Sequence, residues 1–246
     1  MTDEILGQVV AMGGGGFSME PGNPLLDDFI LSLSKRKPAR VCFLPTAGGD
    51  SPAYVARFYR TLSARCVASD LTLIDSALPR RPAESRDLGA FVAEQDIFYV
   101  GGGNTAHLLA LWRTHGLDKL LRDAWLRGAI LCGVSAGMNC WFEGSITDSF
   151  GSLCALSDGL GLLPGSACPH YDGDTKRRPA FQRAISEGLP AGYAADDGAG
   201  LHFSGLQLLG AVSSRPQARA YRVELRAGAV VEEPIPTRFL GTESPR

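Results

Sequence analysis

The sequence contains no long apolar segment, little net charge and no internal repeat. None of its apolar runs reaches the roughly 18 residues that a membrane-spanning helix needs, and the acidic, polar start (Met1–Gly7) predicts no signal peptide. The net charge is −2 and no basic stripe is present, so we expect neither nucleic acid nor a membrane as a partner. With 45% hydrophobic residues, the chain is predicted to be a soluble, globular, cytoplasmic protein.

Cysteine pairs of the C-x-x-C type are also absent. The six cysteines lie mostly in apolar stretches, at Cys42, Cys66, Cys132, Cys140, Cys154 and Cys168. Buried free thiols in a reducing compartment explain them better than disulfides or zinc ligands. No histidine–carboxylate cluster with zinc-ligand spacing occurs, so the sequence predicts neither a metal site nor a cofactor.

Short apolar runs alternate with longer amphipathic ones in the first 135 residues. The short runs predict strands at Gln8–Met12, Val41–Leu44, Leu71–Ile74, Ile97–Val100 and Ile130–Gly133. The longer runs predict helices at Pro24–Ser34, Pro52–Ser69, Asp87–Glu94, Thr105–His115 and Leu117–Leu126. Such alternation is typical of an α/β protein in which helices cover both faces of a mostly parallel sheet. No break in composition marks a second domain, so we expect one domain over residues 1–246.

The pattern is weaker after Phe142. Gly144–Pro169 is rich in glycine, serine and proline and is predicted to be a loop with short elements. A helix is expected at Arg178–Glu187, followed by short strands at Leu201–Phe203, Leu206–Leu209, Ala220–Leu225 and Val230–Pro234. The last two strands are predicted to form a hairpin through Arg226–Gly228.

Gly133-Val134-Ser135-Ala136-Gly137 matches the pattern G-x-S-x-G. In this pattern a nucleophilic serine lies in a strained turn between a strand and a helix, with small residues on both sides. An apolar strand precedes the motif here and a run compatible with a helix follows it. A glycine-rich turn without catalytic function is the alternative, and the flanking elements favour Ser135 as a nucleophile.

A nucleophilic serine needs a general base, and the chain has four histidines. His107 and His115 fall within a predicted helix, and His202 lies in a short strand pattern. His170 lies on a loop beside Pro169, well after the serine. This position favours His170 as the base.

Gly101-Gly102-Gly103-Asn104 follows another predicted strand. Three glycines leave backbone N–H groups exposed, and these can face a developing oxyanion together with the N–H of Ala136.

Two glycine runs invite comparison with the dinucleotide-binding pattern G-x-G-x-x-G/A. Gly101–Ala106 fits the pattern, but a second helical run, Leu117–Leu126, replaces the strand and acidic residue that should follow. Gly13–Gly16 fails because Ser18 occupies the place of the third glycine. Cofactor binding is therefore the weaker interpretation.

Four segments together resemble the peptidase E (aspartyl dipeptidase) family of serine peptidases: Leu44–Gly48, Val100–Thr105, Gly133–Asn139 and Pro169–Tyr171. That family includes cyanophycin-degrading enzymes, and its fold is similar to that of class I glutamine amidotransferases. The resemblance implies a three-layer α/β/α sandwich. It also implies Ser135 as nucleophile, His170 as base and the N–H groups of Gly103 and Ala136 as the oxyanion hole.

The third member of the catalytic triad is expected to be Asp148, which lies about as far beyond the serine as the acid of that family. Its predicted role is to orient His170. Glu143, Asp196 and Asp197 are the alternatives.

Asn104, Arg177 and Arg178 are the candidate substrate-binding residues. Family members that cleave after an N-terminal aspartate carry a longer basic segment after the histidine, whereas Tyr171–Arg178 is compact. The sequence therefore predicts a serine peptidase for small peptides with weak or absent cleavage after N-terminal aspartate. An esterase, a cyanophycinase-like hydrolase and a catalytically weak binding module of the same fold stay as alternatives, and a homodimer is left open.

Overall fold

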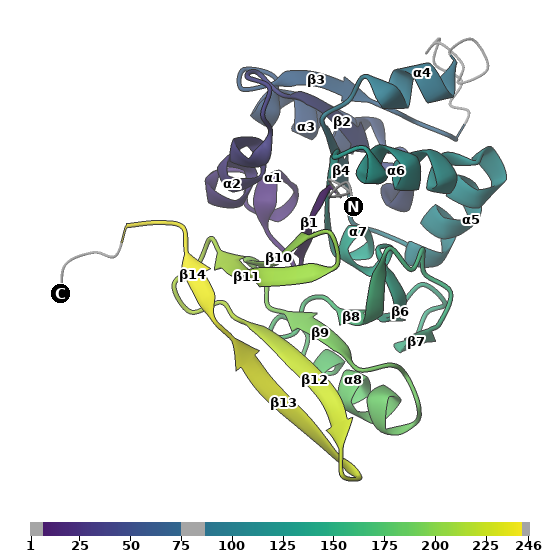
Figure 1. Ribbon diagram of the computed structural model, residues 1–246, viewed down its shortest axis with the longest axis vertical. Helices are drawn as coiled ribbons and strands as arrows, with labels where there is room; N and C mark the ends of the chain where they lie inside the picture. The colour runs from purple at the N-terminus through teal and green to yellow at the C-terminus, as the bar shows by residue number, and fades with distance from the viewer. Residues whose placement is uncertain (1–6, 75–86, 243–246) are drawn as a thin grey trace, which may run out of the picture.

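The computed structural model describes residues 7–74 and 87–242 (Figure 1). Most of the polar start that predicted no signal peptide, residues 1–6, lies outside the described residues. The elements up to the G-x-S-x-G motif are β1 (Gln8–Met12), α1 (Gly16–Met19), α2 (Leu25–Leu33), β2 (Arg40–Leu44), the 3-10 turn η1 (Thr46–Gly48), α3 (Pro52–Leu62), β3 (Val67–Asp70), α4 (Leu88–Ala93), β4 (Ile97–Val100), α5 (Thr105–His115), α6 (Leu117–Leu126) and β5 (Ile130–Val134). The elements that follow are α7 (Ala136–Asn139), β6 (Phe142–Thr147), β7 (Cys154–Leu156), β8 (Leu163–Cys168), α8 (Arg177–Ser186), β9 (Gly192–Ala195), β10 (Ala199–Ser204), β11 (Gln207–Ser213), β12 (Ala220–Arg226), β13 (Ala229–Ile235) and β14 (Thr237–Phe239).

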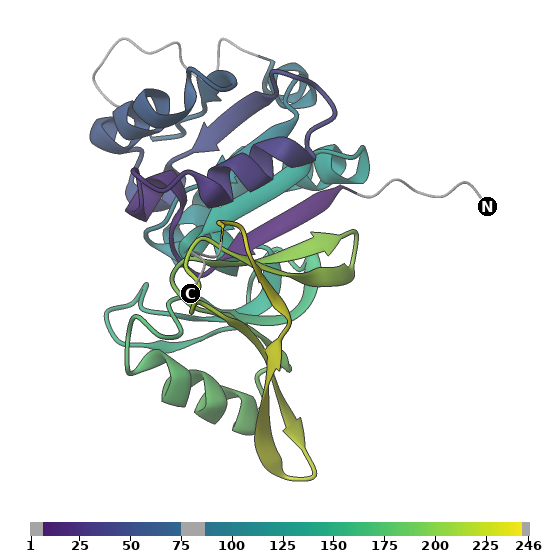
Figure 2. The same cartoon turned by 90° about the vertical axis from the view of Figure 1, so that its left-hand side faces the viewer.

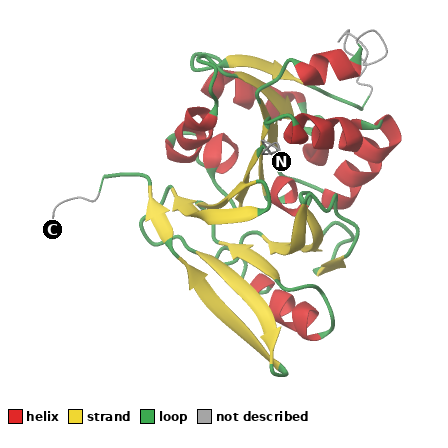
Figure 3. Ribbon diagram, viewed as in Figure 1, coloured by secondary structure: helices red, strands yellow, loops and turns green. Residues whose placement is uncertain are grey.

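The larger sheet has eight strands in the order β14-β11-β10-β1-β5-β4-β2-β3. The five strands from β1 to β3 in this order run parallel to one another, and β10 joins β1 in the antiparallel sense. Helices lie on both sides of this sheet (Figure 3). The predicted α/β class with a mostly parallel sheet between helices is confirmed.

Two apolar layers form because successive residues of a strand point to opposite faces. In β1, Val9 and Ala11 pack in one buried cluster with α5 and α6, while Val10 and Met12 pack in another with α2 and α3. Burial of both faces explains why the central strands are apolar throughout rather than alternating.

A second sheet has six strands in the order β13-β12-β9-β8-β6-β7. Gly144–Pro169 was predicted to be a loop with short elements, and its short elements are strands of this sheet, β6, β7 and β8. Glycine and proline in β8 suggested a loop. Within the strand, however, the glycine is required by its surroundings, because Gly165 adopts φ +87° and a Cβ atom there would overlap the carbonyl oxygen of Ala191. Figure 2 shows the β12–β13 hairpin extending away from the larger sheet beside α8. Buried Phe142 of this sheet belongs to the same apolar cluster as Val9.

One predicted strand and the end of one predicted helix were wrong. Helix α3 ends at Leu62 rather than continuing to Ser69, and the following strand is Val67–Asp70 rather than Leu71–Ile74. This strand lies at the sheet edge and Val67 is 51% exposed, so its apolar signal is weak. Leu73 and Ile74 instead donate their N–H groups to Oδ2 of Asp50, at 2.5 and 2.7 Å.

The cysteines agree with their prediction as free thiols. All six are free, and all but Cys154 are buried. No helix within the described residues is both long enough and apolar enough to cross a membrane.

Candidate active site

Ser135 lies in the turn between β5 and α7, as the G-x-S-x-G pattern predicts. Its backbone has φ 59° and ψ −111°, a conformation that costs free energy for any residue with a side chain. The N–H of Ser135 donates to the carbonyl oxygen of Met12 at 3.1 Å, which ties the turn to the end of β1. The strained turn leaves the side chain partly exposed at the carboxyl end of the parallel strands.

The two glycines of the motif are required by close packing of the backbone around Ser135. A Cβ atom at Gly133 would overlap the carbonyl group of Gly137. A Cβ atom at Gly137 would lie 2.6 Å from the carbonyl oxygen of Val100. Helix α7 can therefore approach β4 and β5 only because both positions lack a side chain.

Ser135 and His170 line one pocket of about 390 Å³ at the carboxyl end of the larger sheet. No hydrogen bond joins the Ser135 hydroxyl to the His170 ring among those of the described residues. Contacts of this kind are often long in the absence of substrate and tighten when it binds. The pocket is also lined by Ser18, Met19, Ser51, Ala53, Tyr54, Arg57, Gly102 and Val134.

The imidazole of His170 is held by a carboxylate. Its Nδ1 atom lies 2.6 Å from Oδ1 of Asp197, and the two side chains are only 19% and 16% exposed. With Nδ1 engaged, Nε2 is left to accept a proton. Burial by itself raises the pKa of Asp197, but the hydrogen bond and charge of His170, with the charge of Arg215, outweigh it and lower that pKa. Asp197 is therefore held as a carboxylate.

The chain leaves space for the carboxylate of Asp197 at two glycines. A Cβ atom at Gly14 would overlap Oδ1, and one at Gly173 would lie 2.6 Å from Oδ2. Asp172 adds a further contact, because its Oδ1 accepts the N–H of Asp197 at 2.7 Å. The Gly13–Gly16 run, which fails the dinucleotide pattern, thus makes room for this carboxylate at Gly14. It also accepts the backbone N–H of His170 at the carbonyl oxygen of Gly13, at 3.3 Å.

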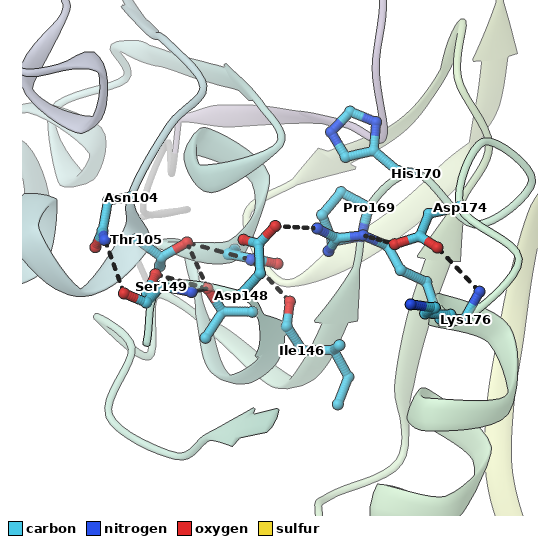
Figure 4. Close-up of polar contacts among 12 residues, drawn as sticks. Asn104, Thr105, Ile146, Asp148, Ser149, Pro169, His170, Asp174 and Lys176 are labelled. Atoms are coloured by element: carbon cyan, nitrogen blue, oxygen red, sulfur yellow. Dashed lines mark hydrogen bonds and ion pairs between the residues drawn. The ribbon is translucent and has the colours of Figure 1, made fainter. Parts of the chain in front are cut away.

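Asp148 does not contact His170, so its predicted role in orienting the base was wrong. Its Oδ2 accepts from Nη2 of Arg177 at 3.3 Å, and its side chain is 60% exposed. Figure 4 draws the polar contacts of Asp148, none of which reaches His170. The expectation rested on distance along the chain, but β6 leads away from Ser135 into the second sheet.

Glu143 and Asp196, which the sequence also offered as the acid, bind groups away from His170. Glu143 accepts the N–H of Gly165 at 2.8 Å. Asp196 accepts the N–H of Arg219 at 2.9 Å, and burial raises its pKa to about 6. Of the four candidate carboxylates, Asp197 is the one that binds His170.

The turn Gly101–Asn104 runs past Ser135. A Cβ atom at Gly102 would lie 3.3 Å from the Cβ atom of Ser135. Three of the four N–H groups of the turn have acceptors: Leu44 O for Gly101 (3.0 Å), Tyr54 Oη for Gly102 (3.1 Å) and Ala47 O for Asn104 (2.8 Å). Within the described residues, no acceptor takes the N–H of Gly103. The N–H of Ala136, the first residue of α7, has no partner inside that helix either.

Asn104 does not line the pocket, contrary to its predicted role in binding substrate. Its Oδ1 accepts the N–H of His107 at 2.9 Å, which caps α5. Its Nδ2 donates to the carbonyl oxygen of Ser149 at 2.9 Å (Figure 4). The side chain is used to hold two segments of the fold together.

Arg177 and Arg178 are also engaged outside the pocket. Arg177 is 7% exposed and pairs with Asp148 and Asp174. Arg178 donates to Glu232 at 2.7 Å, and its guanidinium lies 4.8 Å from the centre of the Tyr171 ring. Neither guanidinium is free to receive a substrate in this arrangement.

Helices α1 and α3 supply the pocket residues that sequence reasoning missed, chiefly Ser18, Tyr54 and Arg57. Their positions in the sequence carry no motif. The available signal was topological, because these helices follow β1 and β2, and ligands of open α/β sheets bind at the carboxyl ends of the strands.

Comparisons with known proteins agree with this architecture. Residues 9–209 match peptidase family S51. The chain is 53% identical over 236 residues to a Bacillus subtilis (strain 168) protein named as the uncharacterized peptidase YgaJ, covering 95% of this chain and 99% of that one. It is 34% identical over 137 residues to peptidase E of Streptomyces coelicolor, covering 54% of this chain and 51% of that one.

The solved structure of a peptidase from an acI-B1 Actinobacterium shares the fold, with a TM-score of 0.66, 15% identity and coverage of 93% of this chain and 94% of that one. The resemblance to the peptidase E family that the motifs indicated is thereby confirmed. The chain belongs to peptidase family S51 and is a peptidase.

Proposed function

We propose that this peptidase cleaves short peptides by a serine mechanism with Ser135 as the nucleophile. The observation that carries the proposal is the shared pocket. In it, the strained Ser135 lies with His170, whose Nδ1 is bound to Asp197 at 2.6 Å. A base that is held by a carboxylate and shares a pocket with a partly exposed hydroxyl is the arrangement that activates a serine.

The reaction runs through an acyl-enzyme. Ser135 Oγ attacks the substrate carbonyl carbon while Nε2 of His170 takes the hydroxyl proton. The N–H groups of Gly103 and Ala136 stabilise the oxyanion that forms, and Gly103 is suited to this because its N–H has no other acceptor in the described part of the chain. The protonated ring then gives its proton to the departing amine. Water, deprotonated by His170, releases the acyl group and restores Ser135.

Asp197 replaces Asp148 as the third member of the proposed triad. Its carboxylate accepts a hydrogen bond from Nδ1–H, which sets the tautomer of His170 and stabilises the imidazolium that forms during attack. The lowered pKa of Asp197 keeps it ionised for this role.

The pocket supports short peptides as substrates. Its volume of about 390 Å³ is at the small end of ligand sites, and hydroxyl groups and one guanidinium line it beside Met19 and Ala53. Arg57 is the arginine of this lining and is exposed. Its Nη1 atom already donates to the carbonyl oxygen of Ser18 at 2.8 Å. An exposed guanidinium of this kind recognises a carboxylate less well than a buried, bidentate one, so we keep the expectation of weak cleavage after N-terminal aspartate.

A fluorophosphonate probe and a library of dipeptides varied at the first residue test the proposal together. The native protein should be labelled at Ser135 and should release amine from at least some dipeptides. Ser135→Ala should lose labelling and hydrolysis, by several orders of magnitude in rate. Ser32→Ala, an exposed serine of α2, is the matched control and should behave as the native protein.

Hydrolysis by Ser135→Ala at the native rate would overturn the serine mechanism. A native protein that binds dipeptides but is neither labelled nor active would instead be a binding module of this fold.

A further inference from the structure

Tyr54 connects the wall of the pocket to the turn that follows β4. It lies on α3 and lines the pocket, and its hydroxyl oxygen accepts the N–H of Gly102 at 3.1 Å. The same oxygen lies 2.5 Å from Oγ of Ser18 on α1, where either hydroxyl can donate. We propose that Tyr54, assisted by Ser18, is a positioning residue that aims the N–H of Gly103 at the oxyanion. This inference rests on the proposed serine mechanism.

The Tyr54 ring is held by aromatic neighbours, which makes its hydroxyl a fixed point. It lies edge-on to Phe43, with ring centres 4.9 Å apart, and it contacts Phe17 at 5.9 Å. Burial raises the pKa of the hydroxyl, so it stays protonated over the range in which peptidases are assayed. A protonated phenol can accept the N–H of Gly102 and still donate its own proton.

The turn needs such a fixed point because three of its residues are glycines. Glycine moves freely between backbone conformations, so Gly101–Gly103 has little intrinsic preference for one orientation. On one side the turn lies against Ala47, whose carbonyl oxygen accepts the N–H of Asn104 at 2.8 Å and leaves no room for a Cβ atom at Gly103. On the other side, Tyr54 is the side chain that binds its backbone. Tyr54 thus fixes the Gly101–Gly102 peptide group and Ala47 fixes the Gly103–Asn104 peptide group. The Gly102–Gly103 peptide group between them, which carries the N–H of Gly103, is thereby held from both ends.

Ser18 joins this arrangement to helix α1. Besides its contact with Tyr54, its carbonyl oxygen accepts from Nη1 of Arg57 at 2.8 Å. Helices α1 and α3 are therefore bound together beside Ser135, in the wall that a substrate would touch. Loss of the Ser18 hydroxyl should loosen the Tyr54 hydroxyl while leaving the ring in place.

The test compares Tyr54→Phe with the native protein on the best dipeptide from the library. Removing a direct oxyanion donor typically costs about 100- to 1,000-fold in kcat, so loss of its positioning residue should cost roughly 10- to 100-fold. KM should change less than about twofold, because the oxyanion forms only in the transition state. The amino aldehyde of the dipeptide's first residue has its aldehyde in place of the scissile carbonyl and adds Ser135 Oγ there. It should lose affinity by the same factor as kcat.

Three further variants keep the test decisive. Tyr59→Phe, on the same helix but bonded to Asp70 at 2.8 Å outside the pocket, should keep native kcat. Ser18→Ala should lose less kcat than Tyr54→Phe, and the double variant should be no slower than Tyr54→Phe alone, because both act through one hydroxyl.

Native kcat in Tyr54→Phe, or a rise in KM with kcat unchanged, would overturn the positioning role. Either result would leave the serine mechanism standing if Ser135→Ala is inactive, so the two proposals fail separately.

Discussion

The Nδ1 atom of His170 lies 2.6 Å from Oδ1 of Asp197, across 27 positions of sequence. His170 follows β8 and Asp197 follows β9. These strands are parallel neighbours, from Ser166 paired with Gly192 to Cys168 paired with Ala194, so their carboxyl ends meet at one edge of the second sheet. That pairing brings the base and its carboxylate together.

Asp197→Asn is expected to lower kcat by roughly 100- to 10,000-fold, because the amide no longer favours the tautomer with Nε2 unprotonated. Thermal unfolding should show that the variant stays folded. Asp148→Asn is the matched control, since its carboxylate is exposed and pairs with Arg177. Steady-state kinetics of both variants check this, and a larger loss in Asp148→Asn would favour Asp148 as the acid of the triad.

Gly14→Ala is expected to lose most activity while the chain still folds. The new methyl group would overlap Oδ1 of Asp197 and displace the carboxylate from His170. Gly22→Ala is the control, because no atom lies within 4 Å of a Cβ atom there. Native kcat/KM in Gly14→Ala would show that the position of the Asp197 carboxylate does not limit the reaction.

Asp27 should make the protein less stable as pH rises. Burial raises its pKa from 3.8 to about 6, against the hydrogen bond that Tyr99 donates to it. Between these two values the folded state binds the proton more tightly than the unfolded state, so the free energy of unfolding falls with increasing pH. Relative to the native protein, Asp27→Asn should gain about 2 kcal/mol between pH 4 and pH 8. Urea unfolding at both pH values measures this gain, and an equal difference at the two would contradict it.

Dipeptides that begin with aspartate are expected to be cleaved no faster than their alanine counterparts. Arg177 and Arg178 pair with carboxylates outside the pocket, and the exposed Arg57 is the guanidinium that lines it. Matched Asp-Leu and Ala-Leu substrates provide the comparison. Preferential cleavage of Asp-Leu that disappears in Arg57→Gln, but persists in Arg178→Gln, would show that Arg57 reads the aspartate.

Local patterns in the sequence were sufficient for the central strands of the larger sheet, β1, β2, β4 and β5, and for the serine. Helices Thr105–His115 and Leu117–Leu126 were predicted with the bounds that the structure has. The strand, turn and helix around Ser135 also followed from sequence, because the small residues that permit the strained turn lie within two positions of it. Each of these features depends on interactions between residues close in sequence, such as apolar periodicity and backbone sterics.

The β12–β13 hairpin of the second sheet was predicted from sequence. Tertiary structure alone decided the rest of that sheet, the partner of His170 and the use of the arginines. Strands β8 and β9 are paired in the sheet although α8 separates them along the chain. The carboxylate that binds His170 is therefore Asp197, which follows β9, and not Asp148, which was chosen by its distance from Ser135 along the chain. Arg177 and Arg178 were taken up by carboxylates that the second sheet brings to them, while α1 and α3 placed Ser18, Tyr54 and Arg57 at the pocket. Contacts between distant segments depend on strand order, and the composition of each segment does not encode that order.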